Sequence, residues 1–414
     1  MGRARSFETS KGTSVNDPIV IVGAGLGGIR LAENLRNGGY SGGVVLLGQE
    51  PHPPYDRPPL SKSVVTGDGG RVDLKPAEFY AEQDIDLRTG TRVVAVDPDG
   101  HTVTVEHDGE RSDVAYGTLV LATGLVARKF PGVADDVTGV HVVRTIEDAL
   151  ALRAAAGSAT HAAVIGAGFI GCEVAASLHH LDVPVTLIEP TPTPLATAIG
   201  ERIGQMVTRL HTESGIDLRT GSGVDEIVVA DDGSVSGVVL SGGERVDANL
   251  VVVGIGGYPD LDYLEGSGIE LAPREAGGGI ACNGVGRTSA ADVYALGDAA
   301  NWTDAHGDHH RVEHWNHVVD HAALVAAELL GHTITHQSVP YFWSDQFGLK
   351  IQMLGASHPD DEVHVVDDDG RKFLAYYSRD GILTGVIGAG RVGKVMKTRQ
   401  FLQTPTPVSA VLES

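Results

Sequence analysis

The sequence contains the glycine fingerprint of a dinucleotide-binding loop twice, at residues 23–28 and at residues 166–171. Each copy directly follows a short apolar run, Ile19–Val22 in the first case and Ala162–Ile165 in the second. This arrangement predicts a buried strand that turns sharply into a helix, where the bare backbone and the helix N-terminus accept a pyrophosphate. One fingerprint alone is weak evidence. Two in one chain predict that two dinucleotides bind and that electrons pass between them.

An acidic residue ends the second apolar strand of each unit. Glu50 follows Val44–Leu47 with two residues between, and Glu189 directly follows Val185–Ile188. Each acid lies about 20 residues past its fingerprint, which is the spacing at which a carboxylate reaches an adenine ribose. Both units therefore carry the second half of the dinucleotide-binding pattern as well as the first.

Composition narrows the class of protein. With 414 residues, 42% of them hydrophobic and 21% charged, the chain is long enough for two or three globular domains. It has no apolar run long enough to cross a membrane, and residues 1–16 are polar, so we expect a disordered tail there rather than a secretory signal. The net charge of −23 argues against nucleic acid as a partner. Cys172 and Cys282 are the only cysteines, which is typical of a cytoplasmic protein.

Three units are expected along the chain. The first is predicted to be discontinuous, over residues 17–125 and 251–332, because apolar strands after residue 250 return to its sheet. Residues 126–250 form the inserted second unit around the second fingerprint. Residues 333–414 alternate β-prone stretches with glycine turns, which predicts a C-terminal α+β domain. The fold class is therefore α/β, with two Rossmann-like dinucleotide-binding domains and a third, smaller domain.

Further segments make the chain resemble the flavin-dependent ferredoxin reductases of bacterial oxygenase systems, a branch of the two-dinucleotide flavoprotein disulfide reductase superfamily. The resemblance is most specific at Pro54–Lys62 and Phe342–Gln346, and it covers nearly the whole chain. Other matching segments are both fingerprints, Ala122–Gly124 with Arg128, Ala295–Asp298 and Glu313–Trp315. The resemblance implies a glutathione-reductase-like fold in which the first unit binds FAD and the second binds NAD.

The resemblance also implies the residues of the site. The residues expected to hold FAD are Gly23, Gly25, Gly28, Glu50, Arg57, Lys62, Thr123, Gly124, Arg128, Asp298 and Trp315. Those expected to hold NAD are Gly166, Gly168, Phe169, Ile170, Gly171, Glu189, Gly254 and Gly256. Lys62, Glu173 and Trp315 are the expected catalytic residues, with Lys62 facing Glu173 beside the flavin.

The residue types suit these roles. Pro58 and Pro59 stiffen a loop that can form a wall against a planar ring, and Arg57 and Lys62 supply positive charge for a pyrophosphate or a reduced flavin. Asp298 follows a strand, at the sheet edge where open α/β folds bind ligands. A helix expected to begin near Glu313 would point its positive N-terminus at the flavin.

Residues near Glu189 indicate which nicotinamide is used. A carboxylate accepts hydrogen bonds from a ribose diol and repels a 2′-phosphate. The next five residues read Pro-Thr-Pro-Thr-Pro and supply no arginine or lysine for such a phosphate. NADH is therefore favoured over NADPH.

The missing cysteines indicate the reaction. Disulfide reductases of the superfamily carry a close cysteine pair in the flavin domain, and residues 17–125 contain none. The expected enzyme is an NADH-dependent flavoprotein that passes hydride to FAD and then single electrons to a small acidic [2Fe–2S] ferredoxin. That ferredoxin would supply a dioxygenase or a haem-thiolate monooxygenase. A rubredoxin reductase or an NADH oxidase is the alternative within this class, and a redox-signalling flavoprotein like apoptosis-inducing factor is the alternative outside it.

Two clusters remain open. Histidines crowd residues 306–321, and His310, His314, His317 and His321 follow the spacing of one helix face, but no acidic or thiolate partner completes a metal motif, so no metal is predicted. A basic run, Arg391, Lys394, Lys397 and Arg399, either steers the ferredoxin or forms a solvated helix face. Neither nucleic acid nor a membrane is expected as a partner, and the chain is expected to be a monomer or a homodimer.

Overall fold

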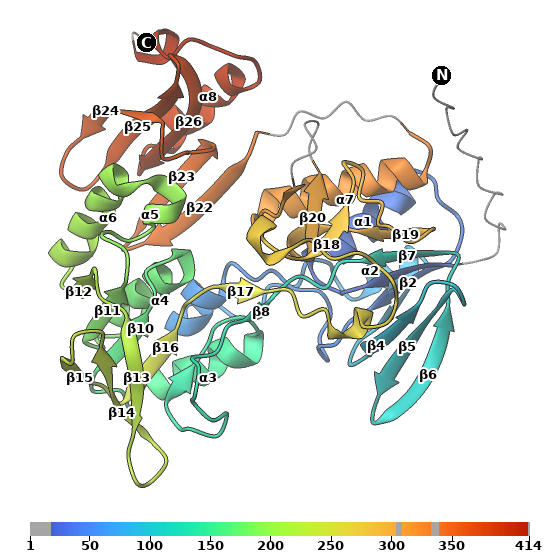
Figure 1. The fold of residues 1–414 in the computed structure, drawn as a ribbon, viewed down its shortest axis with the longest axis horizontal. Coiled ribbons are helices and arrows are strands. Elements are labelled where there is room, and N and C mark those ends of the chain that lie inside the picture. Colours follow the sequence, from blue (N-terminus) through green and yellow to red (C-terminus); the bar gives the residue numbers. More distant parts are fainter. Residues whose placement is uncertain (1–17, 304–308, 333–338, 413–414) are drawn as a thin grey trace, which may run out of the picture.

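The computed structural model describes residues 18–303, 309–332 and 339–412. A parallel sheet forms the centre of the first unit, in the order β19-β7-β1-β2-β3. Its members are β1 (Ile19–Val22), β2 (Val44–Leu47), β3 (Ile85–Arg88), β7 (Thr118–Leu121) and β19 (Val293–Ala295). The inner strands are apolar throughout because the sheet is covered on both faces. Helices α1 (Leu26–Asn37) and α7 (Trp315–Leu329) lie side by side against it (Figure 1).

Smaller elements complete the first unit. An antiparallel sheet of β4 (Arg92–Asp97), β5 (Thr102–His107) and β6 (Glu110–Ala115) shares the apolar core of the parallel sheet through its valines. The remaining short elements are η1 (Leu60–Val64), α2 (Glu78–Glu82), η2 (Asp262–Leu264), η3 (Arg274–Ala276), β18 (Ile280–Cys282), η4 (Gly297–Ala299), β20 (Ala300–Thr303) and β21 (His309–His310).

The second unit repeats the plan of the first. Its parallel sheet has the order β12-β11-β10-β16-β9, formed by β9 (Val140–His141), β10 (Ala162–Ile165), β11 (Val185–Glu189), β12 (Asp217–Thr220) and β16 (Leu250–Val253). The helices are α3 (Ile146–Ala156), α4 (Phe169–His180), α5 (Ala196–Ile199) and α6 (Glu201–Glu213). A second core beside this sheet is formed with the antiparallel strands β13 (Val224–Val229), β14 (Val235–Leu240) and β15 (Arg245–Asp247).

The chain enters and leaves the second unit at one place. Strand β8 (Val126–Ala127) leads out of the first unit, and β17 (Gly257–Tyr258) leads back. The two strands pair antiparallel with each other, so the entry and the exit form a short two-stranded ribbon. Strand β19 then joins the first sheet beside β7. The strand Leu250–Val253, which was predicted to lead the chain back to that sheet, is instead β16 of the second sheet, where it pairs with β10.

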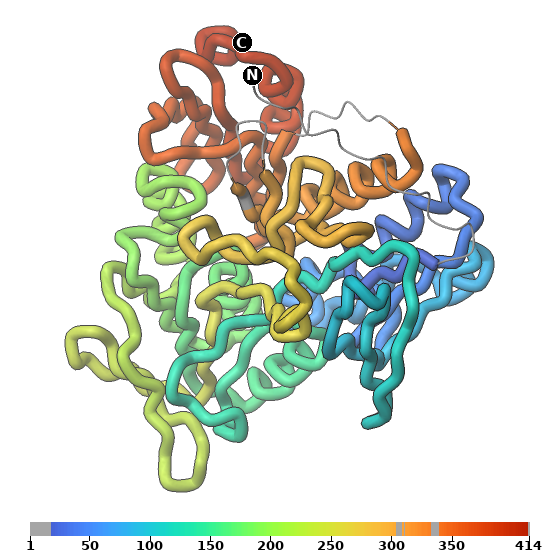
Figure 2. The backbone as a smooth tube through the Cα atoms, turned by 45° about the vertical axis from the view of Figure 1, so that its right-hand side comes forward, coloured from blue at the N-terminus to red at the C-terminus, as the bar shows by residue number. Residues whose placement is uncertain are grey.

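A third sheet, antiparallel throughout, follows in the order β22-β23-β26-β25-β24. It consists of β22 (Tyr341–Gln346), β23 (Leu349–Gly355), β24 (Glu362–Asp368), β25 (Phe373–Arg379) and β26 (Ile382–Ala389), with α8 (Val392–Thr398), η5 (Arg399–Leu402) and α9 (Ser409–Leu412). In both views this sheet lies against α5 and α6 of the second unit (Figure 1, Figure 2). The two share one apolar cluster, and the Tyr377 hydroxyl donates to the Ile199 carbonyl across the contact at 2.8 Å.

The predicted fold class is confirmed, with two differences in detail. The helix expected near Glu313 begins at Trp315, and His310 lies on β21 rather than on that helix, because the chain is extended until His314. The three domain boundaries stay a prediction. The predicted tail and His306 lie outside the described residues. Within the described ranges, no helix is long and apolar enough to span a membrane.

Candidate functional site: a cavity between the three units

A cavity of about 920 Å³ opens where the three units meet. The first fingerprint lines it with Gly23 and Gly25, the start of α4 adds Phe169 and Ile170, and β22 adds Trp343. Other predicted site residues that line it are Glu50, Arg57, Lys62, Thr123, Gly124, Glu173, Asp298 and Trp315. One cavity thus brings together most of the predicted FAD residues with the beginning of the second fingerprint helix.

The glycines of the fingerprints fit a pyrophosphate. Gly23 has φ +114°, and a Cβ there would collide with the Ala122 carbonyl, so only glycine suits the turn. A Cβ on Gly25 or Gly168 would instead meet no atom within 4 Å, so space beside each loop is open to a ligand. These two glycines cap α1 and α4, and within the described structure neither helix has a side-chain N-cap hydrogen bond. The free N–H groups there suit FAD in the first unit and a nicotinamide dinucleotide in the second.

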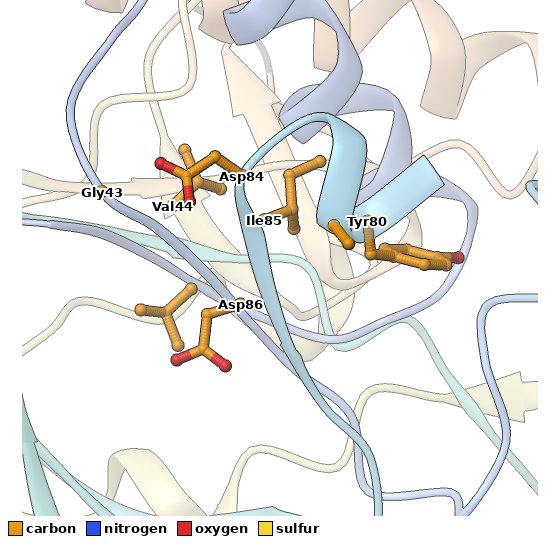
Figure 3. Close-up of a pocket in the computed structure, with 8 residues that line it drawn as sticks. Gly43, Val44, Tyr80, Asp84, Ile85 and Asp86 are labelled. Carbon is orange, nitrogen blue, oxygen red and sulfur yellow. The ribbon is translucent and has the colours of Figure 1, made fainter. Parts of the chain in front are cut away.

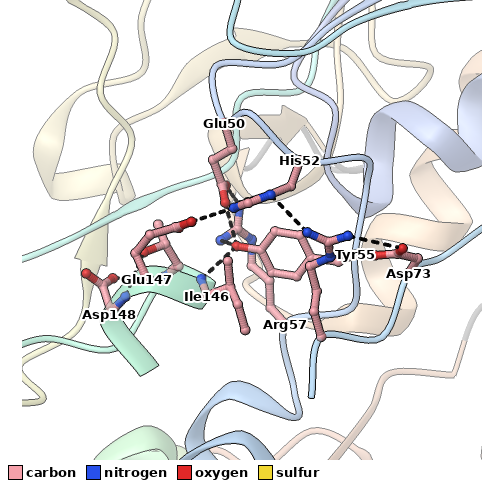
Figure 4. A network of polar contacts seen from close by, with 10 residues as sticks. Glu50, His52, Tyr55, Arg57, Asp73, Ile146, Glu147 and Asp148 are labelled. Atoms are coloured by element: carbon pink, nitrogen blue, oxygen red, sulfur yellow. Dashed lines mark hydrogen bonds and ion pairs between the residues drawn. The ribbon is translucent and has the colours of Figure 1, made fainter. Parts of the chain in front are cut away.

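A polar network ties the loop after β2 to the start of α3 (Figure 4). Glu50 accepts hydrogen bonds from the Tyr55 hydroxyl at 2.5 Å and from Arg57 at 2.7 Å. The same hydroxyl accepts the Ile146 N–H at 3.0 Å, and burial raises the pKa of Tyr55. His52 and Glu147 meet at 2.5 Å beside this network. Glu50, the expected ribose ligand, is therefore held in place by donors from its own loop.

Arg144 is a cavity residue that the sequence reasoning missed. Its Nε donates to the Leu125 carbonyl at 2.9 Å, and its Nη2 lies 3.8 Å from the Asp298 carboxylate. Burial raises the pKa of Asp298 and lowers the pKa of Arg144, and the attraction between the two charges opposes both shifts. A weak signal exists in the sequence, because Arg144 directly precedes the capping box of α3.

Arg128, which the resemblance places at FAD, lies elsewhere. Its guanidinium is 5.4 Å from the centre of the Tyr258 ring, and it is not among the described residues that line the cavity. Its backbone N–H donates to the Gly256 carbonyl, next to the β8–β17 ribbon. The role assigned to Arg128 stays a prediction without a cavity contact.

Lys62 and Glu173 meet at the cavity. The Lys62 Nζ lies 2.7 Å from the Glu173 Oε2 and donates to the Pro58 carbonyl at 3.0 Å. Only 3% of the Glu173 side chain is exposed, so the pair is formed by a nearly buried carboxylate. The backbone of η1 leaves helical geometry at Lys62, with φ −124° and ψ −107°. The expected contact between the two residues is present, and their catalytic role stays a prediction.

Aromatic rings form one side of the cavity. Trp315 donates its Nε1–H to Asp56 at 2.9 Å, and its ring centre lies 6.2 Å from that of Trp343. Trp343 in turn stacks with Tyr341 at 5.8 Å. Since Tyr341 is partly exposed and is not among the described cavity residues, these rings form a row that leads out of the cavity.

The glycines of the second fingerprint and its acid, Glu189, are not among the described residues that line the cavity, whereas Phe169 and Ile170 of the same fingerprint are. Glu189 ends β11, is 9% exposed, and accepts the Ala167 N–H at 2.7 Å. Its other oxygen accepts the N–H and hydroxyl of Thr191 at 3.0 and 2.9 Å. Gly166, Gly171 and Gly254 are in close mutual backbone contact, while Gly256 has φ +86°. The expected NAD residues are thus adjacent at the carboxyl edge of the second sheet.

The two cysteines take no part in the cavity. Cys172 and Cys282 are both buried as free thiols, and neither lies among its described lining residues. Burial raises the pKa of Cys172 well above its usual value and that of Cys282 to about 12. A buried thiol with a raised pKa stays protonated at neutral pH, which fits electron transfer without a thiol relay.

The histidines of α7 pack as neutral rings. His321 stacks on Trp302 with ring centres 3.6 Å apart, and His317 lies 3.9 Å from His321. Burial lowers the pKa of His317 to about 4 and that of His321 to about 2. Over the described ranges, no three histidine, cysteine or acidic side chains are grouped as metal ligands.

A smaller hollow of about 330 Å³ lies away from both fingerprints, between β2, β3 and α2 (Figure 3). Asp84 and Asp86 line it, but the Tyr80 ring points away from both carboxylates. No set of complementary polar groups converges on this hollow as it does on the larger cavity.

The basic run near the C-terminus is only partly available to a partner. Arg391 pairs with Asp367 at 2.8 Å and with Asp369 at 3.1 Å, and Lys394 lies 3.5 Å from Asp367. Arg399 lies over the Tyr341 ring at 6.0 Å, beside the aromatic row.

Two fingerprint units that share one cavity, with no thiol in its lining, define a flavoprotein of the two-dinucleotide class. Residues 17–322 match the model of the family described as pyridine nucleotide-disulphide oxidoreductase, and residues 341–412 match that of the reductase C-terminal domain. The chain belongs to the pyridine nucleotide-disulphide oxidoreductase family. It is an oxidoreductase with FAD and NAD as its cofactors, as the sequence predicted.

Relatives with known names extend this result. The chain is 34% identical to rhodocoxin reductase of Rhodococcus erythropolis, over 94% of this chain and 90% of the relative. It is 37% identical to the ferredoxin–NAD(+) reductase component of the anthranilate 1,2-dioxygenase system of Burkholderia cepacia, over 82% of each. The fold matches the covalent putidaredoxin reductase–putidaredoxin complex with a TM-score of 0.89, at 30% identity, over 96% of this chain and 95% of that one.

Proposed function

We propose that this protein is an NADH-dependent ferredoxin reductase that serves a dioxygenase or a haem-thiolate monooxygenase. The observation that carries the proposal is the shared cavity, in which the first fingerprint, the α4 helix and an aromatic row meet without a thiol. When bound, FAD supplies the chemistry that links a two-electron donor to a one-electron acceptor.

Different residues of the chain would bind the two dinucleotides, FAD and NADH. The glycine loop at Gly23 and Gly25 would bind the FAD pyrophosphate, with Arg144 and Asp298 facing the flavin half of the cavity. Gly168 and Glu189 would bind and orient NADH, and Phe169 would exclude water from the contact between the two ring systems. Lys62, held by Glu173, would place a positive charge beside the flavin, where reduction adds negative charge.

The acceptor is proposed to be a small acidic [2Fe–2S] ferredoxin that docks beside Tyr341 and Trp343. Arg399 lies over the Tyr341 ring at 6.0 Å, and Lys350 lies over the Trp343 ring at 5.8 Å while it pairs with Asp345 at 2.9 Å, so Arg399 supplies most of the positive charge beside the aromatic row. Because the whole chain has a net charge of −23, this local charge must guide docking against the overall field. The apparent affinity for the ferredoxin is therefore expected to fall as salt is added.

We further propose a cytoplasmic location, since both thiols are free and buried, and a monomeric or homodimeric state. The NAD domain is proposed to run from residue 126 to the end of β16 (Leu250–Val253), because β16 pairs with β10 of the second sheet. The FAD domain is proposed to comprise residues 17–125 and the chain from β17 to residue 332, and the C-terminal domain residues 333–414.

Anaerobic stopped-flow absorbance tests the donor. The bound flavin should bleach rapidly with NADH, and kcat/KM with NADPH should be at least about tenfold lower. Replacing Glu189 with alanine should reduce this preference about tenfold, because a 2′-phosphate no longer meets a carboxylate. Glu244→Ala, on the surface of the same unit, is the matched control and should keep it. Equal rates with both nucleotides in the wild type would contradict the assignment of Glu189.

Mixing the reduced protein with an oxidised acceptor tests the second half-reaction, the transfer of electrons from the flavin to the acceptor. Rapid reduction of a [2Fe–2S] ferredoxin supports the proposal. If a rubredoxin or oxygen were reduced faster than the ferredoxin, that acceptor would be assigned in place of the ferredoxin. Slow transfer to every acceptor, with a persistent long-wavelength absorbance band, would favour a redox-signalling flavoprotein.

A further inference from the structure

Glu173 is bound by three separate segments of the chain. Its Oε2 accepts the Ser61 hydroxyl at 2.5 Å and lies 2.7 Å from the Lys62 ammonium, both on η1 of the first unit. Its Oε1 accepts the Ser344 hydroxyl at 2.7 Å and the Asp345 N–H at 3.2 Å, both on β22 of the third sheet. Glu173 itself lies on α4 of the second unit. One carboxylate therefore joins all three units at the cavity.

Strand β22 continues this contact away from the cavity. Its alternate residues Phe342, Ser344 and Gln346 are buried, and they form its inward face. The Gln346 Nε2 donates to the Ser344 Oγ at 3.0 Å, and the Gln346 Oε1 lies 2.9 Å from the Nε2 of His211 on α6. Ser344, Gln346 and His211 are each 1% exposed or less, so water does not compete for these bonds.

Each hydrogen bond from Glu173 through Ser344 and Gln346 to His211 has one possible donor, and the groups that bind Glu173 determine which it is. The Lys62 ammonium and the Asp345 N–H can only donate, so both oxygens of Glu173 are acceptors. Ser344 must then give its hydroxyl hydrogen to Glu173, which leaves its oxygen to accept from the Gln346 amide. The Gln346 carbonyl oxygen consequently faces His211.

The same logic settles the state of His211. Burial lowers the pKa of His211 to about 4, so the ring is neutral near pH 7 and carries one hydrogen. Since the Gln346 carbonyl oxygen needs a donor, that hydrogen lies on Nε2. Among the described residues nothing bonds to the buried Nδ1, which agrees with a ring whose one hydrogen lies on Nε2.

We infer that His211, Gln346 and Ser344 form a one-way chain of hydrogen-bond donors that positions Glu173, and through it the Lys62 ammonium, at the cavity. They are positioning residues, since none of them lines the cavity among its described residues. This inference rests on the proposed function, because it takes the Lys62 charge to lie beside the bound flavin. Its consequence is that the third sheet sets how easily the flavin is reduced.

The test compares Ser344→Ala with Ser357→Ala in the FAD-loaded protein. Ser357 also donates a hydrogen bond from the C-terminal unit to the second unit, to the Ala198 carbonyl at 2.7 Å, but it does not touch Glu173. Without Ser344, Glu173 loses a donor and interacts more fully with Lys62, which neutralises more of the positive charge near the flavin. The flavin midpoint potential should become more negative.

The rate of flavin reduction at saturating NADH should fall about five- to tenfold in Ser344→Ala, with the KM for NADH within about twofold, since one net hydrogen bond is worth about 1 kcal/mol. Gln346→Met, which keeps the side-chain length, should change both quantities in the same direction by less. Ser357→Ala should match the wild type. A potential and a rate in Ser344→Ala equal to those of Ser357→Ala would overturn the inference.

The two proposals fail in distinguishable ways. The potential is measured by photochemical reduction, which does not require NADH. If the wild-type flavin were not reduced by NADH, the proposed function would fail, whatever the potentials of the variants.

Discussion

A single guanidinium, that of Arg144, brings positive charge into the cavity from the segment that joins β9 to α3. Its Nε donates to the Leu125 carbonyl, and this bond to the backbone fixes the orientation of the guanidinium and of its two terminal nitrogens. Asp298 is its nearest counter-charge, at a distance too long for a direct hydrogen bond. The pair leaves donors on Arg144 available to an anionic ligand.

Replacing Arg144 with methionine should therefore weaken FAD binding about tenfold, equivalent to about 1.4 kcal/mol for the loss of charged hydrogen bonds. The measurement is titration of the FAD-free protein, followed by quenching of flavin fluorescence. Arg128→Met is the control, because its guanidinium stacks on Tyr258. If Arg128→Met binds FAD more weakly than Arg144→Met, the assignment made from the family resemblance is right and ours is wrong.

The contrast between Arg144 and Arg128 shows which site residues can be predicted from the sequence and which cannot. The fingerprint glycines were predictable because their spacing alone fixes a turn and a helix start. Arg144 was not, because its place depends on how the second unit is rotated against the first. Ser344 was missed for the same reason, since its partner Glu173 lies on another unit.

At the scale of an element, α7 carries imidazole rings where a helix core usually has aliphatic side chains. His321 is 4% exposed and stacks on Trp302, and His317 follows one turn earlier. The helical spacing of His314, His317 and His321 was visible in the sequence, whereas the burial of His321 and the partial burial of the other two were not. That outcome depends on Trp302, which β20 supplies from outside the helix.

Acid should destabilise the protein through this helix. An exposed histidine has a pKa of about 6.5, so the unfolded chain gains protons before the buried rings do. The stabilisation is complete above that value and is lost as the pH falls toward 4, by about 1.4 kcal/mol per pH unit for each ring. His321→Gln should therefore reduce the difference in unfolding free energy between pH 6.5 and pH 5 by about 2 kcal/mol.

Urea unfolding of the FAD-loaded protein at the two pH values measures this effect. His358→Gln serves as the control, because that side chain is 50% exposed and should leave the difference unchanged. An equal pH dependence in His321→Gln and the wild type would show that the ring titrates normally in the folded state.

At the scale of the whole molecule, the third sheet and the second unit form one body. Phe373 and Tyr377 of β25 belong to the same apolar cluster as Ile199 and Leu210 of the second unit. The sequence predicted both units but not this contact, since the strand pattern of residues 341–389 shows that one face is buried without showing what covers it.

The Tyr377 hydroxyl tests the contact. Tyr377→Phe removes its bond to the Ile199 carbonyl and leaves that oxygen buried without this donor, which should cost about 1–2 kcal/mol of unfolding free energy. Tyr376→Phe is the matched control on the opposite face of β25, where it packs in a different cluster. The midpoint of urea unfolding is the measurement, and equal midpoints for both variants would contradict a structural role for this bond.

The ribbon of β8 and β17 places the way into the second unit beside the way out. A segment whose two ends are neighbours can be cut out and exchanged without rerouting the rest of the chain. The second unit can therefore be exchanged as one segment. Replacing the chain between β8 and β17 with that of a relative is expected to give this protein the relative's coenzyme preference. The donor of such a graft must reproduce the α5 and α6 surface, because the third sheet rests on it.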